Sequence, residues 1–213
     1  IRLCDWSSDV CSSDLAVAAH AAQLTPTPVI DASWPAIEID ATAGQACLPE
    51  ETVFDPGGIG KGLAADLVAE ELAPQAEGIL VNVGGDVRLC GEADDPAGWV
   101  LTVEDPFDPT EELTRIALPH GAVATSSKQA RRWTTSTGAA HHIIDPTTGR
   151  PADGDVAAVT VVASHAWWAE VQATSLFLQG PSGLASADET VEALMVLDDG
   201  SRIATPGMEA VLR

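Results

Sequence analysis

Four glycines fall within six residues of the segment Asp55–Gly62, and this segment limits what the chain can fold into more than any other. It lies between a short β-like run and a helical run that begins at Leu63. Glycines at such a turn let backbone N–H groups come close to a ligand, and the following helix points its positive end at the same place. The segment therefore favours an anionic ligand such as a phosphate, and a plain strand-to-helix turn is the structural alternative.

The segment differs from two common phosphate-binding sequences. Asp55 stands where a Walker loop begins with glycine, and Gly62 replaces the Ser or Thr that follows the lysine. Leu63 stands where a dinucleotide-binding fingerprint has its third glycine. This segment, Asp55–Gly62, is called the glycine loop below. Alone it identifies neither of these nucleotide-binding classes.

Five other segments carry polar residues at characteristic spacings. They are Val81–Asp86, with a double glycine before an acid; Ala124–Ser126; Arg132–Trp133; His141–Pro151, with two histidines and an aspartate around a Pro/Gly turn; and Ala169–Thr174, in a helical run. In this order and spacing the chain resembles the ApbE family, the FAD:protein FMN transferases, from about Pro35 to about Gly200.

The resemblance implies an ApbE-like α+β fold of mainly antiparallel sheets with a few packed helices. Runs of short strands broken by few helices favour the same fold class on pattern alone. The resemblance also implies an enzyme that moves FMN from FAD to a threonine hydroxyl of an acceptor protein, releases AMP and needs Mg²⁺. Two alternatives stay open: a pyrophosphate hydrolase that converts FAD to FMN and AMP, and a flavin-binding protein without turnover.

Glu170 and Thr174 are the candidate metal ligands. They are four residues apart in a predicted helix, so they share a face, and both carry the hard oxygen atoms that suit Mg²⁺. The resemblance implies that the Gly60 carbonyl completes the set and that the family has Asp where Glu170 stands. The extra methylene moves the carboxylate by about 1.5 Å. A surface Glu beside a buried Thr is the structural alternative.

His142 is the candidate catalytic base, because a neutral imidazole can take a proton from an attacking hydroxyl at neutral pH. The resemblance gives this histidine the role of base and places Asp145 in the same constellation. His141 is the weaker candidate, since adjacent strand residues point to opposite faces. A purely structural role for either histidine is the alternative.

The remaining candidates are contacts to the flavin or the pyrophosphate. Lys61 and Arg132 offset the negative charge of the ligand, and the others bring backbone or hydroxyl groups toward it. The full set is Gly57, Gly58, Lys61, Gly84, Gly85, Asp86, Thr125, Ser126 and Arg132. For the glycines the alternative is an ordinary strand-end turn, and for the cations it is a solvated side chain.

Composition excludes several classes of protein. The formal net charge of −22 is opposite in sign to that of a nucleic-acid-binding surface. No run of eighteen apolar residues exists, so the sequence predicts no transmembrane segment. Hydrophobic residues make up 46% of the chain, enough for a sizeable core, and they include Cys47 and Cys90, which we expect to be buried.

The first fifteen residues resemble the in-frame translation of a DNA-sequencing adapter, so we expect residues 1–15 to be non-native. Residues 16–213 then form one flavin transferase domain, truncated at its N-terminal side, and we expect the chain as written to bind FAD weakly or to fold poorly. Both a cytoplasmic and an extracytoplasmic location stay open. Within this domain the sequence predicts helices over Leu63–Leu72 and Ala166–Leu178, with strands that include Thr52–Asp55 and His141–Ile144.

Overall fold

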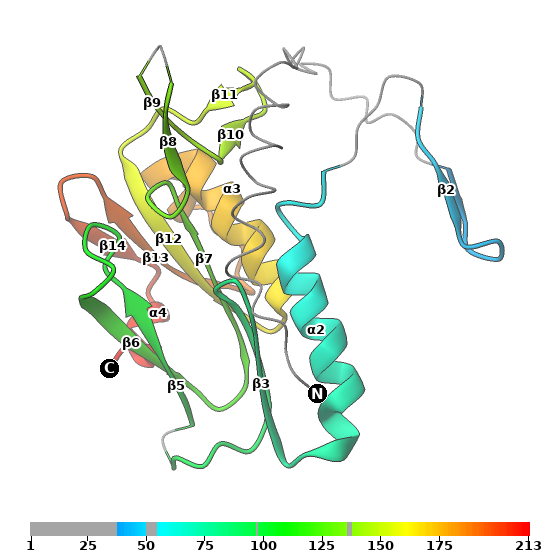
Figure 1. Ribbon diagram of the computed structural model, residues 1–213. Helices are drawn as coiled ribbons and strands as arrows, with labels where there is room; N and C mark the ends of the chain where they lie inside the picture. Colours follow the sequence, from blue (N-terminus) through cyan, green and yellow to red (C-terminus); the bar gives the residue numbers. More distant parts are fainter. Residues whose placement is uncertain (1–37, 50–54, 97, 136–137) are drawn as a thin grey trace.

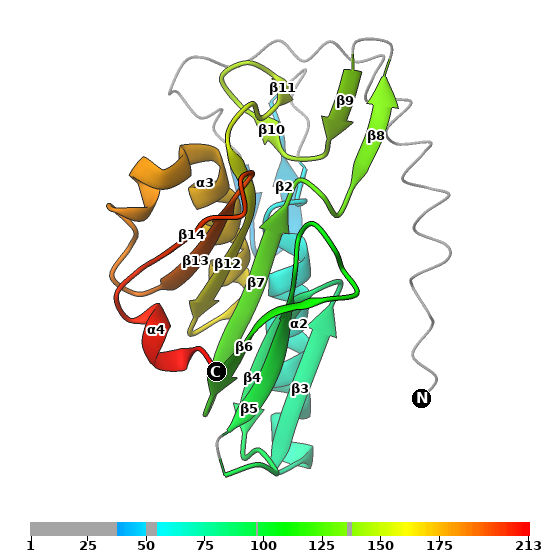
Figure 2. The same ribbon diagram turned by 90° about the vertical axis from the view of Figure 1, so that its left-hand side faces the viewer.

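A six-stranded antiparallel sheet forms the centre of the molecule (Figures 1 and 2). The computed structural model describes residues 38–49, 55–96, 98–135 and 138–213. The strand order in the sheet is β14-β13-β12-β7-β4-β3. In chain order these strands are β3 (Gly78–Val83), β4 (Asp86–Gly91), β7 (Gly121–Ser127), β12 (Val156–Ala163), β13 (Glu192–Leu197) and β14 (Arg202–Ala204).

Four antiparallel hairpins and three α-helices complete the described structure. The hairpins are β1–β2 (Glu38–Asp40, Gln45–Cys47), β5–β6 (Trp99–Glu104, Glu112–Leu118), β8–β9 (Arg132–Thr135, Gly138–His141) and β10–β11 (Ile144–Asp145, Arg150–Pro151). The helices are α2 (Gly60–Leu72), α3 (Ala166–Leu184) and α4 (Met208–Val211), and a 3-10 turn, η1 (Ala73–Gln75), follows α2.

The two faces of the sheet bury separate clusters of side chains, because successive strand residues point to opposite sides. Along β7, Ala122 and Ala124 pack with α3 residues, whereas Val123 packs with the β5–β6 hairpin and Met208 of α4. In Figure 1 the helices α2 and α3 lie on one side of the sheet, and β5, β6 and α4 lie on the other. The molecule therefore has three layers.

Helix α2 packs closely on the start of α3 through small residues. A Cβ atom added to Gly62 would lie 2.3 Å from the carbonyl oxygen of Ala166, so only glycine fits there. Ala65 and Ala69 continue the same buried face. Leu67, by contrast, is 57% exposed, so the apolar side chains of α2 that face the core are its small ones. The resulting close approach brings the first turns of both helices together.

The predicted α+β class and its antiparallel sheet are confirmed. Some boundaries differ. Helix α2 begins at Gly60, inside the glycine loop, and α3 runs to Leu184 across a kink where Gly180 has a φ of 67°. The strand predicted over His141–Ile144 is divided between β9 and β10. Most of the strand predicted over Thr52–Asp55 lies outside the described residues.

The expectation that both cysteines are buried is wrong. Cys47 is exposed at the end of the β1–β2 hairpin, and Cys90 in β4 is half-buried. All six strand residues of that hairpin are exposed. Its cysteine therefore does not belong to the core, which is built by residues of the central sheet and the elements packed on it.

Substituting Gly62 tests the close approach of the two helices. We expect Gly62→Ala to lower the free energy of unfolding by about 1–3 kcal/mol, because the added methyl group overlaps the Ala166 carbonyl and must push the helices apart. Gly58→Ala is the matched control, since an added Cβ there meets no atom within 4 Å. Urea denaturation followed by far-UV circular dichroism measures both. Equal stability of the two variants would show that the contact is not limiting.

Candidate active site

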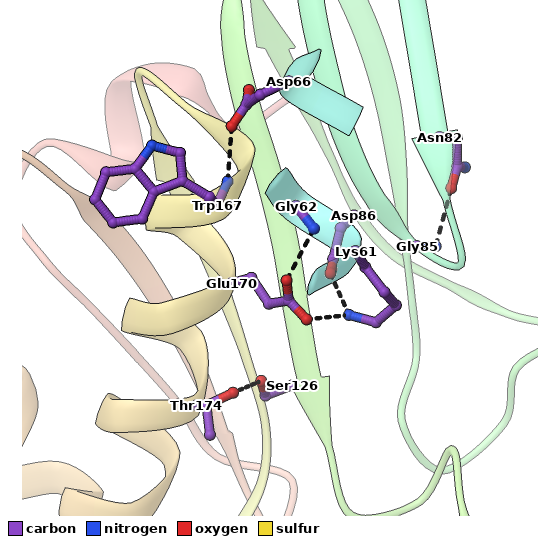
Figure 3. A network of polar contacts seen from close by, with 10 residues as sticks. All are labelled: Lys61, Gly62, Asp66, Asn82, Gly85, Asp86, Ser126, Trp167, Glu170 and Thr174. Carbon is purple, nitrogen blue, oxygen red and sulfur yellow. Dashed lines mark hydrogen bonds and ion pairs between the residues drawn. The ribbon is translucent and has the colours of Figure 1, made fainter. Parts of the chain in front are cut away.

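Lys61, in the first turn of α2, places its ammonium group between two buried carboxylates (Figure 3). Its Nζ donates to Oε1 of Glu170 at 2.6 Å and also to the carboxylate of Asp86. Asp86 and Glu170 are 2% and 3% exposed, respectively. Because Asp86 begins β4 and Glu170 lies on α3, one lysine joins three elements that are far apart in the sequence.

Glu170 also caps the start of α2. Its Oε2 accepts a hydrogen bond from the Gly62 backbone N–H at 2.8 Å. The first N–H groups of an α-helix have no partner within the helix, and the N-cap residue here, Ile59, has no side-chain oxygen to supply one. A carboxylate at this end is further stabilised by the helix dipole. Glu170 thus performs from α3 the role that an N-cap side chain usually performs.

Asp66 performs the reciprocal role for α3. Its Oδ1 accepts from the Ala166 N–H at 3.0 Å, and its Oδ2 accepts from the Trp167 N–H at 2.9 Å. The residue at the N-cap of α3, His165, makes no side-chain capping bond. Each helix therefore carries a buried carboxylate that satisfies the N-terminal backbone of the other. Asp66 was not among the predicted site residues, although it is the one charged residue on the face of α2 that also carries Gly62, Ala65 and Ala69.

Arg88 of β4 fixes the position of Asp66 and was likewise missed. Its Nε lies 3.1 Å from Oδ1 of Asp66, and its Nη1 donates to the carbonyls of Gly121 and Ser164. Burying a carboxylate is costly unless it is paired and hydrogen-bonded, and Asp66 is both. The pair connects the helix junction, where the first turns of α2 and α3 meet, to the central sheet.

Charge at the junction is arranged around Lys61. Burial raises the pKa of Asp86 to about 6, and the negative charge of Glu170 adds to this, although Lys61 acts in the opposite direction. Burial alone would lower the pKa of Lys61, but its bonds to Asp86 and Glu170 outweigh that effect and raise it. Lys61 therefore stays positively charged at neutral pH. Two carboxylates share its single charge, which leaves an excess of negative charge at this point.

Thr174 lies one helical turn after Glu170 and faces the sheet. Its Oγ1 lies 3.0 Å from Oγ of Ser126, on β7, so Glu170, Thr174 and Ser126 line the same side of the sheet (Figure 3). Thr125 does not join them. Its Oγ1 bonds to Oγ1 of Thr160 at 2.9 Å on the opposite face, because adjacent residues of a strand point to opposite sides.

The turn between β3 and β4 lies beside Lys61. Gly84 and Gly85 have φ values of 59° and 96°, the conformation of a two-residue hairpin turn with both φ positive. The side chain of Asn82 stabilises the turn, since its Oδ1 accepts from the Gly85 N–H at 2.9 Å. A Cβ on Gly84 would lie 3.4 Å from Cδ of Lys61. Gly84 and Asp86 thus lie against Lys61, next to the last glycine of the loop, and Gly85 completes the turn between them.

Within the glycine loop, local bonds hold the backbone in shape. The N–H groups of Ile59 and Gly60 donate to the Pro56 carbonyl at 3.0 and 2.7 Å. The Gly57 N–H donates to Oδ1 of Asp55 at 2.8 Å. The Gly57 N–H, one of the amides that the sequence predicted to face an anionic ligand, is thus bonded to the Asp55 carboxylate.

The two adjacent histidines differ in their surroundings. His141 is buried: its Nε2 bonds to the Ala152 carbonyl at 3.0 Å, and its Nδ1 accepts from the Ile143 N–H at 3.3 Å. These bonds require the neutral ring with the proton on Nε2. Burial lowers the pKa of His141, and the charges of Lys128 and Arg132 lower it further, against the bond to Ala152. His141 is therefore a structural residue of the β9–β11 region.

His142 is exposed and remains the candidate base. Partial desolvation lowers its pKa, and the positive charges of Arg131 and Lys61 contribute to the shift. Lys61 is the smallest of these influences. At neutral pH the imidazole is thus uncharged and able to accept a proton.

Asp145 and Arg132 make local contacts. Oδ1 of Asp145 accepts from the N–H and Oγ1 of Thr147, at 2.8 and 2.7 Å, which lowers the pKa of the carboxyl and fixes the turn that follows β10. Arg132 is exposed in β8, and its Nη1 donates to Oε1 of Gln129. The structure does not bring either side chain into the network around Lys61.

The described residues contain neither a membrane-spanning helix nor a ready-made cluster of metal ligands. No helix there is long and apolar enough to span a membrane. Nor do any three or more His, Cys, Asp or Glu side chains of the described ranges cluster as a metal site. A cation at the junction would accordingly need hydroxyl or carbonyl oxygens in addition to carboxylates.

Comparisons with known proteins agree with the sequence motifs. The sequence model of the ApbE family matches residues 15–195. The FAD:protein FMN transferase of Vibrio cholerae is 34% identical over 156 residues, which cover 70% of this chain and 47% of that protein. The corresponding protein of Escherichia coli K12 is 31% identical over 141 residues, which cover 64% of this chain and 39% of that protein. The chain thus spans less than half the length of these two relatives.

Solved structures show the same fold. The ApbE protein of Thermotoga maritima superposes with a TM-score of 0.74 at 29% identity, over 83% of this chain and 59% of that chain. The flavin transferase ApbE of Vibrio cholerae superposes with a TM-score of 0.66 at 31% identity, over 82% of this chain and 57% of that chain.

Removing the Asp66 carboxylate tests the reciprocal capping. We expect Asp66→Ala to lower the free energy of unfolding by about 3 kcal/mol, since it leaves Arg88 and two N–H groups of α3 without their partner. Asp198→Ala removes an exposed carboxylate that pairs with Lys128 and should cost less than about 1 kcal/mol. Chemical denaturation of both variants gives the comparison. Similar losses in the two would contradict a special role for Asp66.

Proposed function

The chain belongs to the ApbE family, and from this premise we propose that it is an Mg²⁺-dependent transferase that moves FMN from FAD to a threonine of an acceptor protein. The observation that carries the proposal is the convergence of the glycine loop, the Gly84–Asp86 turn and Glu170 on Lys61. Lys61 and the glycine loop supply groups that suit a pyrophosphate, and a divalent cation would offset the carboxylates that cap the two helix N-termini. The names of the relatives in Vibrio cholerae and Escherichia coli support the same reaction.

The donor atoms at the junction fit a magnesium ion. Glu170 offers a carboxylate, Thr174 a hydroxyl group one turn later, and the Gly60 carbonyl lies in the adjoining first turn of α2. All are hard oxygen ligands. The excess negative charge around Lys61 favours a divalent cation further. When bound, Mg²⁺ neutralises and orients the pyrophosphate.

The residues of the chain then have distinct tasks. The backbone of Gly57 and Gly58 and the Gly84–Gly85 turn approach the ligand where side chains would be in the way. His142 takes the proton from the acceptor threonine hydroxyl. The threonine oxygen forms a bond to the phosphorus on the FMN side, the bond to the AMP oxygen breaks, and AMP leaves. Positioning and charge neutralisation supply most of the rate enhancement in such transfers.

Product analysis tests this reaction. The protein is incubated with FAD and Mg²⁺, with and without an acceptor that carries a flavinylation threonine. We expect AMP release that depends on the acceptor, and one covalent FMN per acceptor molecule by intact mass. An acceptor with Val in place of that threonine is the control and should gain no mass. Free FMN and AMP without acceptor would identify a hydrolase instead, and FAD binding without AMP would identify a flavin-binding protein.

Substituting the two histidines separates chemistry from folding. We expect His142→Ala to lower the transfer rate by about 10²–10⁴-fold, because it removes the base, while FAD affinity changes little. His141→Ala should mainly lower the melting temperature, because it removes the buried ring that bonds to Ala152 and Ile143. Single-turnover rates and thermal unfolding of each variant provide the measurements. The reverse pattern would assign the base to His141.

A further inference from the structure

Both carboxylate oxygens of Glu170 already have partners in this structure. Oε1 accepts from Lys61 Nζ at 2.6 Å, and Oε2 accepts from the Gly62 N–H at 2.8 Å (Figure 3). A cation that binds Glu170 at the position held by Lys61 must therefore displace the lysine. The Gly62 amide belongs to the backbone of α2 and is held by packing against Ala166. The Lys61 ammonium sits on a flexible stem, and its side chain is 36% exposed. Lys61 is thus the partner that can move.

Lys61 also keeps a second ion-pair partner if it leaves Glu170. It is bonded to Asp86 as well as to Glu170, so it can leave Glu170 without losing its other ion pair. Its stem lies against the Gly84 turn, where an added Cβ would come within 3.4 Å of Cδ. A lysine released from Glu170 accordingly remains near the negative charge of the site.

Without Lys61 or another cation, Asp86 and Glu170 would have no positive charge between them. Asp86 and Glu170 are both nearly fully buried, and buried carboxylates are costly unless they are paired. One ammonium group between them offsets part of this cost, and a divalent cation would offset more.

We propose that Lys61 is a built-in counter-ion that occupies the cation position on Glu170 in the metal-free protein and is displaced from Glu170 when a divalent cation binds. This inference rests on the cation assignment of the proposed function. Lys61 then has two effects on the site: it stabilises the metal-free junction, and it competes with the metal. The displaced ammonium remains on Asp86 and becomes available to the anionic substrate, so that metal binding prepares the site for the pyrophosphate.

A direct competition experiment uses Mn²⁺ as the probe. Free Mn²⁺ is measured by electron paramagnetic resonance, in the absence of FAD, for the wild type and for Lys61→Met. We expect the variant to bind Mn²⁺ at least about tenfold more tightly, because the competing ion pair is gone. Its melting temperature should be lower than that of the wild type without metal and should rise more on adding Mn²⁺. Equal or weaker Mn²⁺ binding by the variant would overturn the proposal.

Two further variants make the result specific. Lys128→Met removes the same charge from a pair with Asp198 elsewhere on the molecule, so its Mn²⁺ affinity should match the wild type. A gain in Lys128→Met equal to that in Lys61→Met would mean that overall charge, not the Glu170 contact, sets the affinity. Thr174→Val removes a hydroxyl ligand and should weaken Mn²⁺ binding; unchanged binding would place the metal away from the contact that Lys61 holds.

A second measurement does not depend on the stability of any variant. The chain contains only two lysines, Lys61 and Lys128, so protein labelled with ¹³C at lysine Cε gives two assignable signals. Titration with Mg²⁺ should shift the Lys61 signal saturably and leave the Lys128 signal in place. A stationary Lys61 signal at Mg²⁺ concentrations that saturate the protein would overturn the proposal. FMN transfer is assayed on the same preparation. If transfer occurs but the Lys61 signal does not shift, the counter-ion proposal is refuted and the proposed function stands. If the Lys61 signal shifts but no transfer occurs, the proposed function is refuted and the counter-ion proposal stands.

Discussion

The structure around the site depends on two carboxylates that cap each other's helices. Glu170 on α3 satisfies the Gly62 N–H of α2, and Asp66 on α2 satisfies the Ala166 and Trp167 N–H groups of α3. Neither helix has a capping side chain of its own. The two helix ends must therefore meet, and Gly62 permits the contact because any larger residue would collide with Ala166. Both helix dipoles point their positive ends here, and they stabilise the two buried carboxylates that hold the helices together.

This arrangement gives Glu170 several roles in one side chain. It caps α2, pairs with Lys61 and, in the proposed function, binds the cation. The resemblance to the ApbE family implies Asp at this position, and the longer Glu extends about 1.5 Å further from α3. In this structure its one carboxylate contacts both the Gly62 amide and the Lys61 ammonium. Groups that serve a site are often costly to stability, and the Asp66–Arg88 ion pair lies at the same helix junction.

The sequence predicted the fold class, both long helices and several members of the junction, because these features have local signals. Glu170 and Thr174 are four residues apart and so share a helix face, and the glycine loop indicates where a helix begins. The sequence could not reveal which distant groups meet. Asp66 pairs with a helix 100 residues later, and nothing in its own neighbourhood indicates that. Thr125 was grouped with Ser126, but strand alternation sends it to the other face, toward Thr160.

The central claim is that FAD and Mg²⁺ bind at the junction of α2 and α3. Backbone amide NMR of ¹⁵N-labelled protein, titrated with FAD and Mg²⁺ together, locates the ligands most directly. We predict saturable shifts that concentrate on the amides of Gly57, Gly58, Gly62, Gly85 and Ser126, with the β13–β14 hairpin unaffected. The chain has a net charge of −22, so weak binding of Mg²⁺ to surface acids would instead give small, unsaturated shifts spread over the molecule. Saturable shifts confined to a region away from the junction would contradict the account.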